Sequence, residues 1–532
     1  MINRNRINSK KYPQAACHRL FRTLKRSLSS SSGLLFFLIL LVPTVAIAVE
    51  EAETKPSGFL AGLDAVFSGI VNFLAQIFFF EIFGLPFIVL WLIGGAIFFT
   101  LRMGFVNIRA FKHAIDVVMG KYDNPDDEGD VSHFQALATA LSGTVGLGNI
   151  AGVAIAVQVG GPGAIFWMTV GGFFGMSSKF TECTLAQMYR RIQPDGTVAG
   201  GPMYYLSKGL GERGLRPLGQ GLAILFALLC VLASMGGGNM FQANQAYAAV
   251  AGIIPALPSW VFGLVVAVLV GFVIIGGIGR IASVTARLVP AMAVIYVLAC
   301  LWILLANLTE IPAAFGTIIV QAFSPEAVGG GFVGTLVQGV RRSAFSNEAG
   351  IGSAAIAHSA ARTDEPLREG IVALLEPFID TIVICNLTGL TIVITGVYQD
   401  LSAAQANGVE LTAIAFSSVI SWFPILLAIA VVLFAFSTMI SWSYYGEKSW
   451  SYMFGENSAI IYKGIYVLCV FIGSVVNLGA VLDFSDMMLL AMAFPNLLGC
   501  YILSGKVASA LSDYMNRLNS GQMPIYSRET SA

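Results

Sequence analysis

The stretch LSGTVGLGNIAG at residues 141–152 decides the fold, because it places Gly143, Gly146 and Gly148 near the centre of a long apolar segment. Each glycine weakens an α-helix by about 1 kcal/mol relative to alanine, so the pattern predicts a helix that unwinds here. Unwound backbone inside a bilayer is tolerated only where protein buries it or where it lines a cavity. Close helix packing through small residues is the alternative explanation for such glycines.

The composition of the chain supports a membrane location. Of its 532 residues, 56% are hydrophobic and only 11% are charged, whereas a soluble domain carries about a quarter charged residues. Most of the surface is therefore expected to contact membrane lipid. Lys+Arg and Asp+Glu balance at 30 each, which argues against nucleic acid as a partner.

The cysteines and histidines are scattered, and motifs of metalloproteases, serine hydrolases and NTPases are missing, so neither an enzyme nor an organic cofactor is expected.

Apolar runs long enough to cross about 30 Å of hydrocarbon recur along the chain. Eleven spans are expected near 78–101, 134–158, 162–189, 218–250, 258–278, 285–308, 328–360, 370–397, 411–442, 460–479 and 484–504. Lysine and arginine are concentrated in alternate loops, which the positive-inside rule assigns to the cytoplasm. The pattern predicts a multi-pass membrane protein with a cytoplasmic C-terminal tail at 506–532, and we expect it in a bacterial inner membrane.

The N-terminal region has the features of a targeting segment. Residues 1–49 begin as a basic, serine-rich region and continue into an apolar run that closes on Ala46-Ile47-Ala48. These features fit two interpretations, a signal peptide cleaved after Ala48 and an uncleaved signal anchor, and the sequence does not choose between them. Residues 50–129 are expected to hold an amphipathic periplasmic segment, an additional transmembrane helix and a cytoplasmic loop.

A second interrupted segment, SNEAGIGSAAIA, lies at residues 346–357. Its N-x-A-G pattern, which begins at Asn347, repeats the pattern that begins at Asn149. In the expected topology the two segments cross the membrane in opposite directions, which is typical of inverted-repeat transporters. We therefore expect an all-α membrane protein with two inverted five-helix repeats, at 130–310 and 326–505.

Several motifs in the same order resemble the sodium:alanine/glycine symporter family, whose members have a LeuT-like fold. They are GTVGLGNIAGVAIA at 143–156, GGPMYYL at 200–206, NMFQANQA at 239–246, SNEAGIGSAAIAH at 346–358 and STMISWSYYGEK at 437–448. The resemblance covers roughly 65–505. It implies a symporter in which inward Na⁺ flow drives uptake of alanine or glycine by alternating access. Proton coupling in the same fold is the nearest alternative, and a channel is a more distant one.

A zwitterionic amino acid needs donors for its carboxylate and acceptors for its ammonium group. The half-helix that starts near Gly146, Gly148 and Asn149 offers backbone N–H groups and a partial positive charge, which suit the carboxylate. Carbonyls that end the first half of the second interrupted segment, near Phe345, suit the ammonium group.

The resemblance implies further residues of the amino-acid pocket. It gives the side chains of Asn149 and Gln242 direct contacts with the substrate, and it places Thr438, Met439 and Trp442 beside them. In such a pocket Met439 and Trp442 would favour alanine or glycine over larger substrates. Taken alone, Gln242 equally fits a bond between neighbouring helices, and methionine and tryptophan are ordinary core residues.

The resemblance also implies a Na⁺ site between the first interrupted helix and the ninth expected span, at 411–442. Its ligands would be the carbonyls of Ser142, Val145 and Phe434 and the hydroxyls of Ser437 and Thr438. Such hydroxyls often bond carbonyls of their own membrane helix, which is the alternative role.

Ionisable side chains within the expected spans are candidates for function. They are Lys179, Glu182, Arg341, Arg342, Glu348, Glu376 and Asp380. Lys179 and Glu182 lie three residues apart and are expected to pair. Glu348 lies in the second interruption and is expected to pair with Arg341 or Arg342, as a gate, and a proton relay is its alternative role.

Overall fold

The computed structural model describes residues 80–526, except 83, 125, 195, 325–330, 400–407 and 477, together with the isolated residues 69, 72 and 76. The expected signal segment at 1–49 lies outside the described residues. The described chain is mostly helical, as expected. Two short antiparallel hairpins were not expected: β1 (Glu81–Ile82) with β2 (Leu85–Pro86), and β3 (Arg191–Ile192) with β4 (Val198–Ala199).

The helices follow the apolar runs of the sequence. They are α4 (Phe87–Arg102), α7 (His133–Thr144), α8 (Val153–Gly160), α9 (Ala164–Tyr189), α12 (Arg216–Met235), α13 (Phe241–Ala251), α14 (Ser259–Ile274), α15 (Gly277–Ala306), α17 (Gly331–Asn347), α18 (Ala354–His358), α19 (Pro366–Val372), α21 (Asn386–Thr395), α23 (Phe423–Phe454), α24 (Ala459–Val475) and α25 (Leu478–Asn519). Further helices connect them: α5 (Val106–Arg109), α6 (Phe111–Val118), α10 (Pro202–Tyr204), α11 (Leu210–Glu212), α16 (Ile311–Ala322), α20 (Leu375–Pro377) and α22 (Val409–Ser417). Within the described part of the chain, four segments are π-helical: η1 (Gly148–Gly152), η2 (Tyr205–Gly209), η3 (Gly236–Met240) and η5 (Phe378–Cys385).

Among the described residues, six helices are long and apolar enough to cross a membrane, or seven if the bent pair His133–Thr144 and Gly148–Gly160 is counted as one span. Other apolar helices, such as Phe87–Arg102 and Ser259–Ile274, are shorter. The molecule is therefore a multi-span membrane protein. The total of eleven spans and the role of α4 as an additional transmembrane helix stay predictions.

Helices α22, α23 and α25 illustrate how helix boundaries differ from the apolar runs. The run at 411–442 is divided into α22 and α23, because Pro424 lies in the first turn of α23 and a proline disfavours helix before it. Helix α25 continues to Asn519, well beyond the expected end at 504, and there carries polar residues such as Arg517. Hydropathy marks the part of a helix that suits lipid, and a helix can extend beyond that part.

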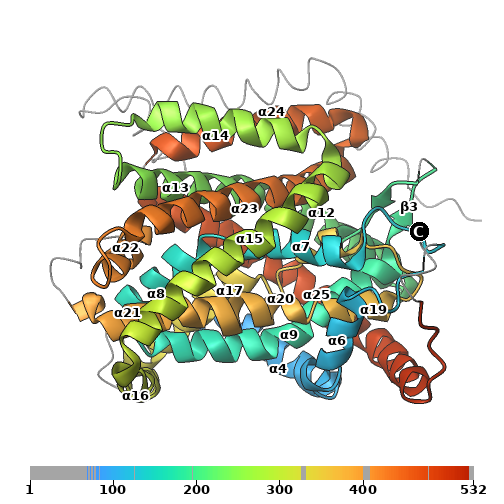
Figure 1. The fold of residues 1–532 in the computed structure, drawn as a ribbon. Coiled ribbons are helices and arrows are strands. Elements are labelled where there is room, and N and C mark those ends of the chain that lie inside the picture. The colour runs from blue at the N-terminus through green and yellow to red at the C-terminus, as the bar shows by residue number, and fades with distance from the viewer. Residues whose placement is uncertain are drawn as a thin grey trace, which may run out of the picture.

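Different helices and loops lie at the two ends of the molecule (Figure 1). One end carries α6, α19, β3 and the C-terminus, and the other carries α16, α21 and α22. At the first end Arg190 donates hydrogen bonds of 2.8 Å to the carbonyls of both Glu128 and Thr363, and Arg517 pairs with Glu365 at 2.6 Å. The loops that the sequence assigns to the cytoplasm thus contact one another.

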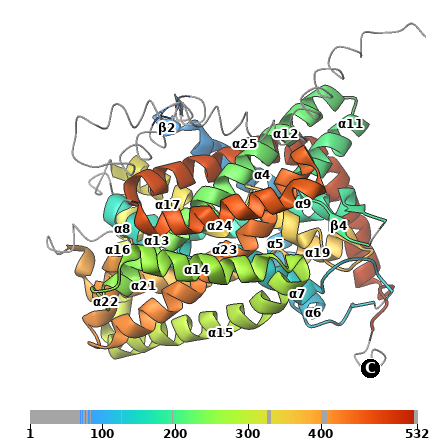
Figure 2. The same ribbon diagram turned by 90° about the horizontal axis from the view of Figure 1, so that it is seen from above.

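The interrupted helices lie inside the bundle. Helix α7 packs against α15 and α23, while α8 packs against α17 and α9. Helices α14 and α24 pack against each other at a side of the bundle, and both views show them together (Figures 1 and 2). This arrangement surrounds both interruptions with helices.

Candidate functional site

The first interruption begins where α7 ends at Thr144. Val145 leaves the helical conformation with a ψ of 80°, and the chain resumes as η1 and α8 after a bend of 50°. Gly143 is still helical, so the break is centred on Val145–Leu147 rather than on all the glycines. The N–H of Gly146 donates to the Asn149 Oδ1 atom at 2.9 Å, which holds the new helix start against the break.

The second interruption follows the end of α17 at Asn347. Glu348, Gly350 and Gly352 have φ angles of 56°, 84° and 91° before α18 begins at Ala354. A left-handed conformation is uncommon for a residue with a side chain, and such residues are found preferentially at functional sites. Both interruptions expected from the sequence are therefore present in the structure.

The two interruptions contact each other. A Cβ atom at Gly148 would lie 3.1 Å from the Cα atom of Ser346, so the approach of the two backbones leaves little room for a side chain. Both segments also bind the same carboxylate: Asn149 Nδ2 donates to Asp380 Oδ1 at 2.6 Å, and Ser346 Oγ donates to Asp380 Oδ2 at 2.9 Å. Asp380 of η5 thus connects the two interrupted helices.

The two asparagines of the repeated pattern have parallel contacts. Asn347 Oδ1 accepts from the N–H of Ala349 at 2.9 Å, as Asn149 Oδ1 does from Gly146. The Nδ2 atom of Asn347 donates to Thr381 Oγ1 at 2.9 Å, next to Asp380 in the sequence. Each asparagine therefore binds backbone of its own interruption and reaches η5.

Gln242 and Thr438 surround the first interruption. Gln242 Oε1 accepts from the N–H of Leu147 at 3.2 Å. A Cβ atom added to Gly146 would lie 3.3 Å from that same oxygen and would overlap Thr438 Oγ1. The structure thus brings Gly146, Gln242 and Thr438 together around one backbone segment.

Trp442, Met439 and Phe345 form an adjoining buried region. The ring of Trp442 packs directly on Gly238 of η3, and its Nε1 donates to Glu348 Oε1 at 2.9 Å. Met439 is buried on the same helix, and its carbonyl accepts from the Tyr466 hydroxyl at 2.7 Å. The Phe345 ring lies edge-on to that of Phe241, with centroids 5.4 Å apart.

The expected Na⁺ ligands of α7 and α23 lie together and bond each other. Ser142 Oγ donates to the Ser437 carbonyl at 2.6 Å, and Thr438 Oγ1 donates to the Ser142 carbonyl at 3.0 Å. Ser437 Oγ donates to the Phe434 carbonyl of its own helix at 2.9 Å. Val145 follows directly on this cluster, and its N–H donates to Leu141 at 2.6 Å. These residues are buried, and Ser437 Oγ also lies 3.4 Å from the Met292 sulfur.

The expected ion pair of Glu348 with Arg341 or Arg342 is wrong. Both arginines contact Asp486 of α25, Arg341 at 3.1 Å. The Glu348 carboxylate instead accepts from Trp442 and from the Ser353 hydroxyl. Glu348 lies beyond the end of α17, where the left-handed backbone directs its side chain toward α23, whereas the arginines face α25.

Sequence reasoning noted Asp380 as an ionisable residue in a span but missed that it joins the interruptions. Its carboxylate is fully buried and accepts hydrogen bonds from Asn149, Ser346 and Thr381. Among the described residues, none of the recorded ion pairs involves Asp380. The signal that was available is the rarity of an aspartate in an apolar run, because an ionised side chain is costly there unless its charge is compensated.

A multi-span helical protein whose two interrupted helices meet at a buried polar site has the architecture of a secondary transporter. Residues 68–528 match the Sodium:alanine symporter family, and the chain belongs to that family. It is therefore a transporter and not an enzyme.

Individual relatives are similar over most of their length. The sodium/alanine symporter AgcS of Methanococcus maripaludis is 44% identical over 80% of this chain and 93% of its own. The amino-acid carrier protein AlsT of Bacillus subtilis is 36% identical over 82% of this chain and 90% of its own. Among solved structures, MhsT in complex with L-phenylalanine aligns with 71% of this chain and 89% of its own, at 16% identity and a TM-score of 0.47.

Proposed function

We propose that this protein couples the entry of Na⁺ to the uptake of a small neutral amino acid, alanine or glycine, by alternating access. The observation that carries the proposal is the meeting of the two interrupted helices at Asp380, which binds Asn149 and Ser346. Family membership and the 44% identity to a sodium/alanine symporter support the same function.

The amino-acid carboxylate would bind at the first interruption. Two backbone N–H groups there, of Gly146 and Leu147, now donate to the side chains of Asn149 and Gln242. These backbone N–H groups could instead donate to a substrate carboxylate. The Asn149 and Gln242 side chains would then form other hydrogen bonds, because an amide side chain can both donate and accept. The ammonium group would bind backbone carbonyls near Phe345. The N–H of Ala349 donates to the Asn347 side chain and not to a carbonyl of α17, so it does not occupy a carbonyl there.

The pocket would be limited by large side chains. Met439 and Trp442 are 1% exposed, and the Trp442 ring is packed on Gly238 with no space for a Cβ atom between them. A tightly packed wall of this kind disfavours longer substrates, because extra methylene groups would need the wall to move. We infer a preference for alanine and glycine.

Sodium would bind the oxygen cluster of α7 and α23. Its proposed ligands are the carbonyls of Ser142, Val145 and Phe434 and the hydroxyls of Ser437 and Thr438. A hard cation suits such oxygen donors. The buried Asp380 adds a negative charge beside Asn149, and a bound cation in the site would compensate that charge.

The proposed architecture is a LeuT-like pair of inverted five-helix repeats, at 130–310 and 326–505, preceded by α4 as an additional helix. The parallel contacts of Asn149 and Asn347 support the repeat. The mutual contacts of the loops rich in lysine and arginine support one common face for them. We assign that face, with the C-terminus, to the cytoplasm of a bacterial inner membrane.

Uptake of radiolabelled alanine into proteoliposomes tests this function. Uptake is expected with an inward Na⁺ gradient and not with choline, and unlabelled glycine should compete more strongly than leucine. An equal rate in choline would contradict sodium coupling. Equal competition by leucine would contradict the inferred size limit.

A further inference from the structure

A chain of buried ionisable side chains lies apart from the candidate substrate and Na⁺ sites. We call it the His–Glu chain; its members, each at most 1% exposed, are His133, Glu369, His358, Glu376, Lys179 and Glu182. They come from α7, α19, α18, α20 and α9. Burying so many charges is expensive, so their arrangement needs an explanation.

Glu369 lies between two histidines. Its Oε2 atom contacts Nδ1 of His133, and its Oε1 atom contacts Nδ1 of His358 at 2.5 Å. Each of these contacts must hold a proton, because two lone pairs would otherwise face each other, and with an ionised Glu369 that proton is on the ring nitrogen. Each histidine therefore has its N–H at Nδ1.

His358 also contacts a second carboxylate. Its Nε2 atom lies 3.3 Å from Glu376 Oε2, while Glu376 Oε1 lies 3.3 Å from Lys179 Nζ. Both ring nitrogens of His358 thus face carboxylate oxygens, and the same reasoning gives this residue two protons. A charged His358 and Lys179 then place two positive charges against the three carboxylates of the chain, Glu369, Glu376 and Glu182. The geometry therefore requires one proton more than neutral histidines would supply.

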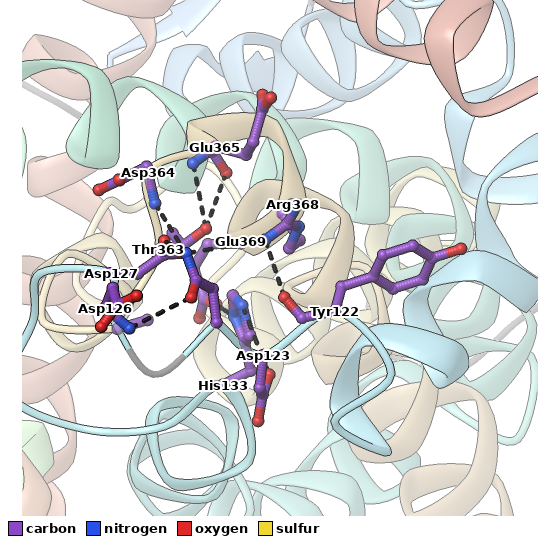
Figure 3. Close-up of polar contacts among 12 residues, drawn as sticks. Tyr122, Asp123, Asp126, Asp127, His133, Thr363, Asp364, Glu365, Arg368 and Glu369 are labelled. Atoms are coloured by element: carbon purple, nitrogen blue, oxygen red, sulfur yellow. Dashed lines mark hydrogen bonds and ion pairs between the residues drawn. The ribbon is translucent and has the colours of Figure 1, made fainter. Parts of the chain in front are cut away.

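The outer end of the chain reaches the molecular surface. The Nε2 atom of His133 is buried without a hydrogen-bond partner among the described residues. Its nearest acid is Asp123, whose Oδ1 atom is 4.0 Å away and whose side chain is 46% exposed. Figure 3 shows His133 and Asp123 facing each other beside Glu369. Asp123 is thus an exposed acid beside the outer end of the chain.

The inner end is attached to the second interruption. Lys179 Nζ lies 3.7 Å from Glu182 Oε1, and Glu182 Oε2 accepts from Asn496 Nδ2 at 2.8 Å. The same amide group donates to the carbonyl of Gly350 at 2.8 Å. A movement of the second interruption would therefore change the surroundings of the chain.

Other titratable and charged groups face the chain from the elements packed around it. They are Cys183 of α9, Arg190 directly after α9, Glu348 of the second interruption, Tyr445 of α23, Tyr205 of η2, Cys500 of α25 and Asp380 of η5. Asp364 and Arg368 lie near Glu369 (Figure 3). Within the described residues, no arginine forms a recorded ion pair with Glu369 or Glu376. These two carboxylates depend on Lys179 and on the histidine protons.

We propose that the His–Glu chain is a proton-binding site that exchanges its proton with the face carrying Asp123, and that the bound proton favours the buried arrangement of the chain. In exchange, the O–H bond of a protonated Asp123 breaks as an N–H bond forms at His133 Nε2, and the His133 Nδ1–H bond breaks as an O–H bond forms on Glu369. Glu369 then passes this proton to Nδ1 of a deprotonated His358, and the neutral His133 ring returns to its Nδ1–H form before the next transfer. Loss of the proton leaves an uncompensated buried charge, which water entry on opening would relieve.

Of the two tests of this inference, only the second rests on the proposed transport function. The first test needs no transport: ¹⁵N NMR of histidine-labelled protein in detergent at pH 7.5, with His358→Gln to assign the signal. Both ring nitrogens of His358 are expected to be protonated. A ring with one unprotonated nitrogen would overturn the proposal.

The second test is Na⁺-driven alanine uptake into vesicles of one orientation, with pH varied on one side at a time. Acid on the Asp123 face, from pH 8 to 6, is expected to slow uptake about threefold or more, since one linked proton allows at most about tenfold per pH unit. Acid on the opposite face should have no such effect. A response confined to the opposite face, or a flat profile, would overturn the proposal.

Variants separate the chain from general effects of acid. Glu369→Gln should flatten the pH response, and Asp123→Asn, at an exposed position where folding is undisturbed, should weaken it. The control Glu365→Gln precedes the same helix, pairs with Arg517 and should keep the wild-type profile. Wild-type profiles in both Glu369→Gln and Asp123→Asn would contradict the proposal. Absence of wild-type uptake would instead contradict the transport function, while the NMR result would still decide the proton site.

Discussion

Asn149 Nδ2 and Asp380 Oδ1 are joined by a hydrogen bond of 2.6 Å, which connects the first interrupted helix to η5. Because Ser346 of the second interrupted segment binds the same carboxylate, movement of either segment relative to η5 must break or rearrange these bonds. Asp380 is thus placed to make the state of one interruption depend on the other.

Asp380→Asn tests that relationship. The variant keeps the size of the side chain but removes its charge and one acceptor, leaving buried donors that cost about 1–3 kcal/mol when unpaired. We expect alanine uptake to fall by about tenfold or more, and more Na⁺ to be needed for half-maximal uptake. Size-exclusion chromatography of the purified variant checks that it is folded. Unchanged Na⁺ dependence would show that the Asp380 charge has no part in ion coupling.

Gly148→Ala tests the close approach of the two backbones. The added methyl group would lie 3.1 Å from Ser346 Cα, so the interruptions would have to separate by a few tenths of an ångström. We expect uptake to fall by about fivefold to tenfold, as overpacking typically costs 1–3 kcal/mol. Gly152→Ala is the matched control, because its new Cβ would meet no atom nearer than 3.9 Å. Equal effects of the two substitutions would contradict the steric argument.

Trp442→Phe tests the contact between α23 and the second interruption. Phenylalanine keeps an aromatic ring against Gly238 but cannot donate to Glu348, which Trp442 Nε1 does at 2.9 Å. Loss of a hydrogen bond to a buried carboxylate should lower the free energy of unfolding by about 1–3 kcal/mol. Thermal unfolding in detergent measures the effect. Trp450→Phe, which removes a bond to the partly exposed Ser458, should be milder, and the opposite order would contradict the assignment.

His113 predicts a pH dependence of stability at the loop face. Burial lowers the pKa of His113 from 6.5 to about 4, and its Nε2 lies 2.7 Å from the Tyr514 hydroxyl of α25. Asp116 opposes the shift, whereas Arg368 and Lys121 add to it. Between pH 6.5 and about 4 the unfolded chain binds a proton that the folded chain does not, so stability falls as the pH falls through this window.

A His113→Gln variant isolates that contribution. The glutamine side chain cannot titrate, so the melting temperature of the variant should fall less than that of the wild type between pH 7 and about 4.5. Other acid effects are common to both proteins and cancel in the comparison. Parallel curves for the two proteins would refute the assignment.

The interrupted helices could be predicted because glycines act locally. Gly146 and Gly350 weaken helices wherever they stand, so a sequence pattern suffices to find the breaks. The roles implied for Gln242 and Thr438 came from family resemblance, and the structure places both beside Gly146. Their contacts with substrate and Na⁺ stay predictions.

The rest depends on contacts between distant segments. His133 and Glu369 are 236 residues apart, and nothing in the spacing of the histidines indicates that they meet. Similarly, Arg341 and Arg342 pair with Asp486 of α25, which helical spacing around Glu348 does not predict. The π-helix that contains Asp380 also has no reliable sequence signal.

The central claim is that Na⁺ and the amino acid bind as a coupled pair where the interrupted helices meet. Calorimetric titration of the purified protein with alanine, in Na⁺ and in choline at equal ionic strength, tests it most directly. Coupling free energies between sites are typically 1–3 kcal/mol, so Na⁺ is expected to tighten alanine binding by about tenfold or more. The same alanine affinity in both salts would contradict the account.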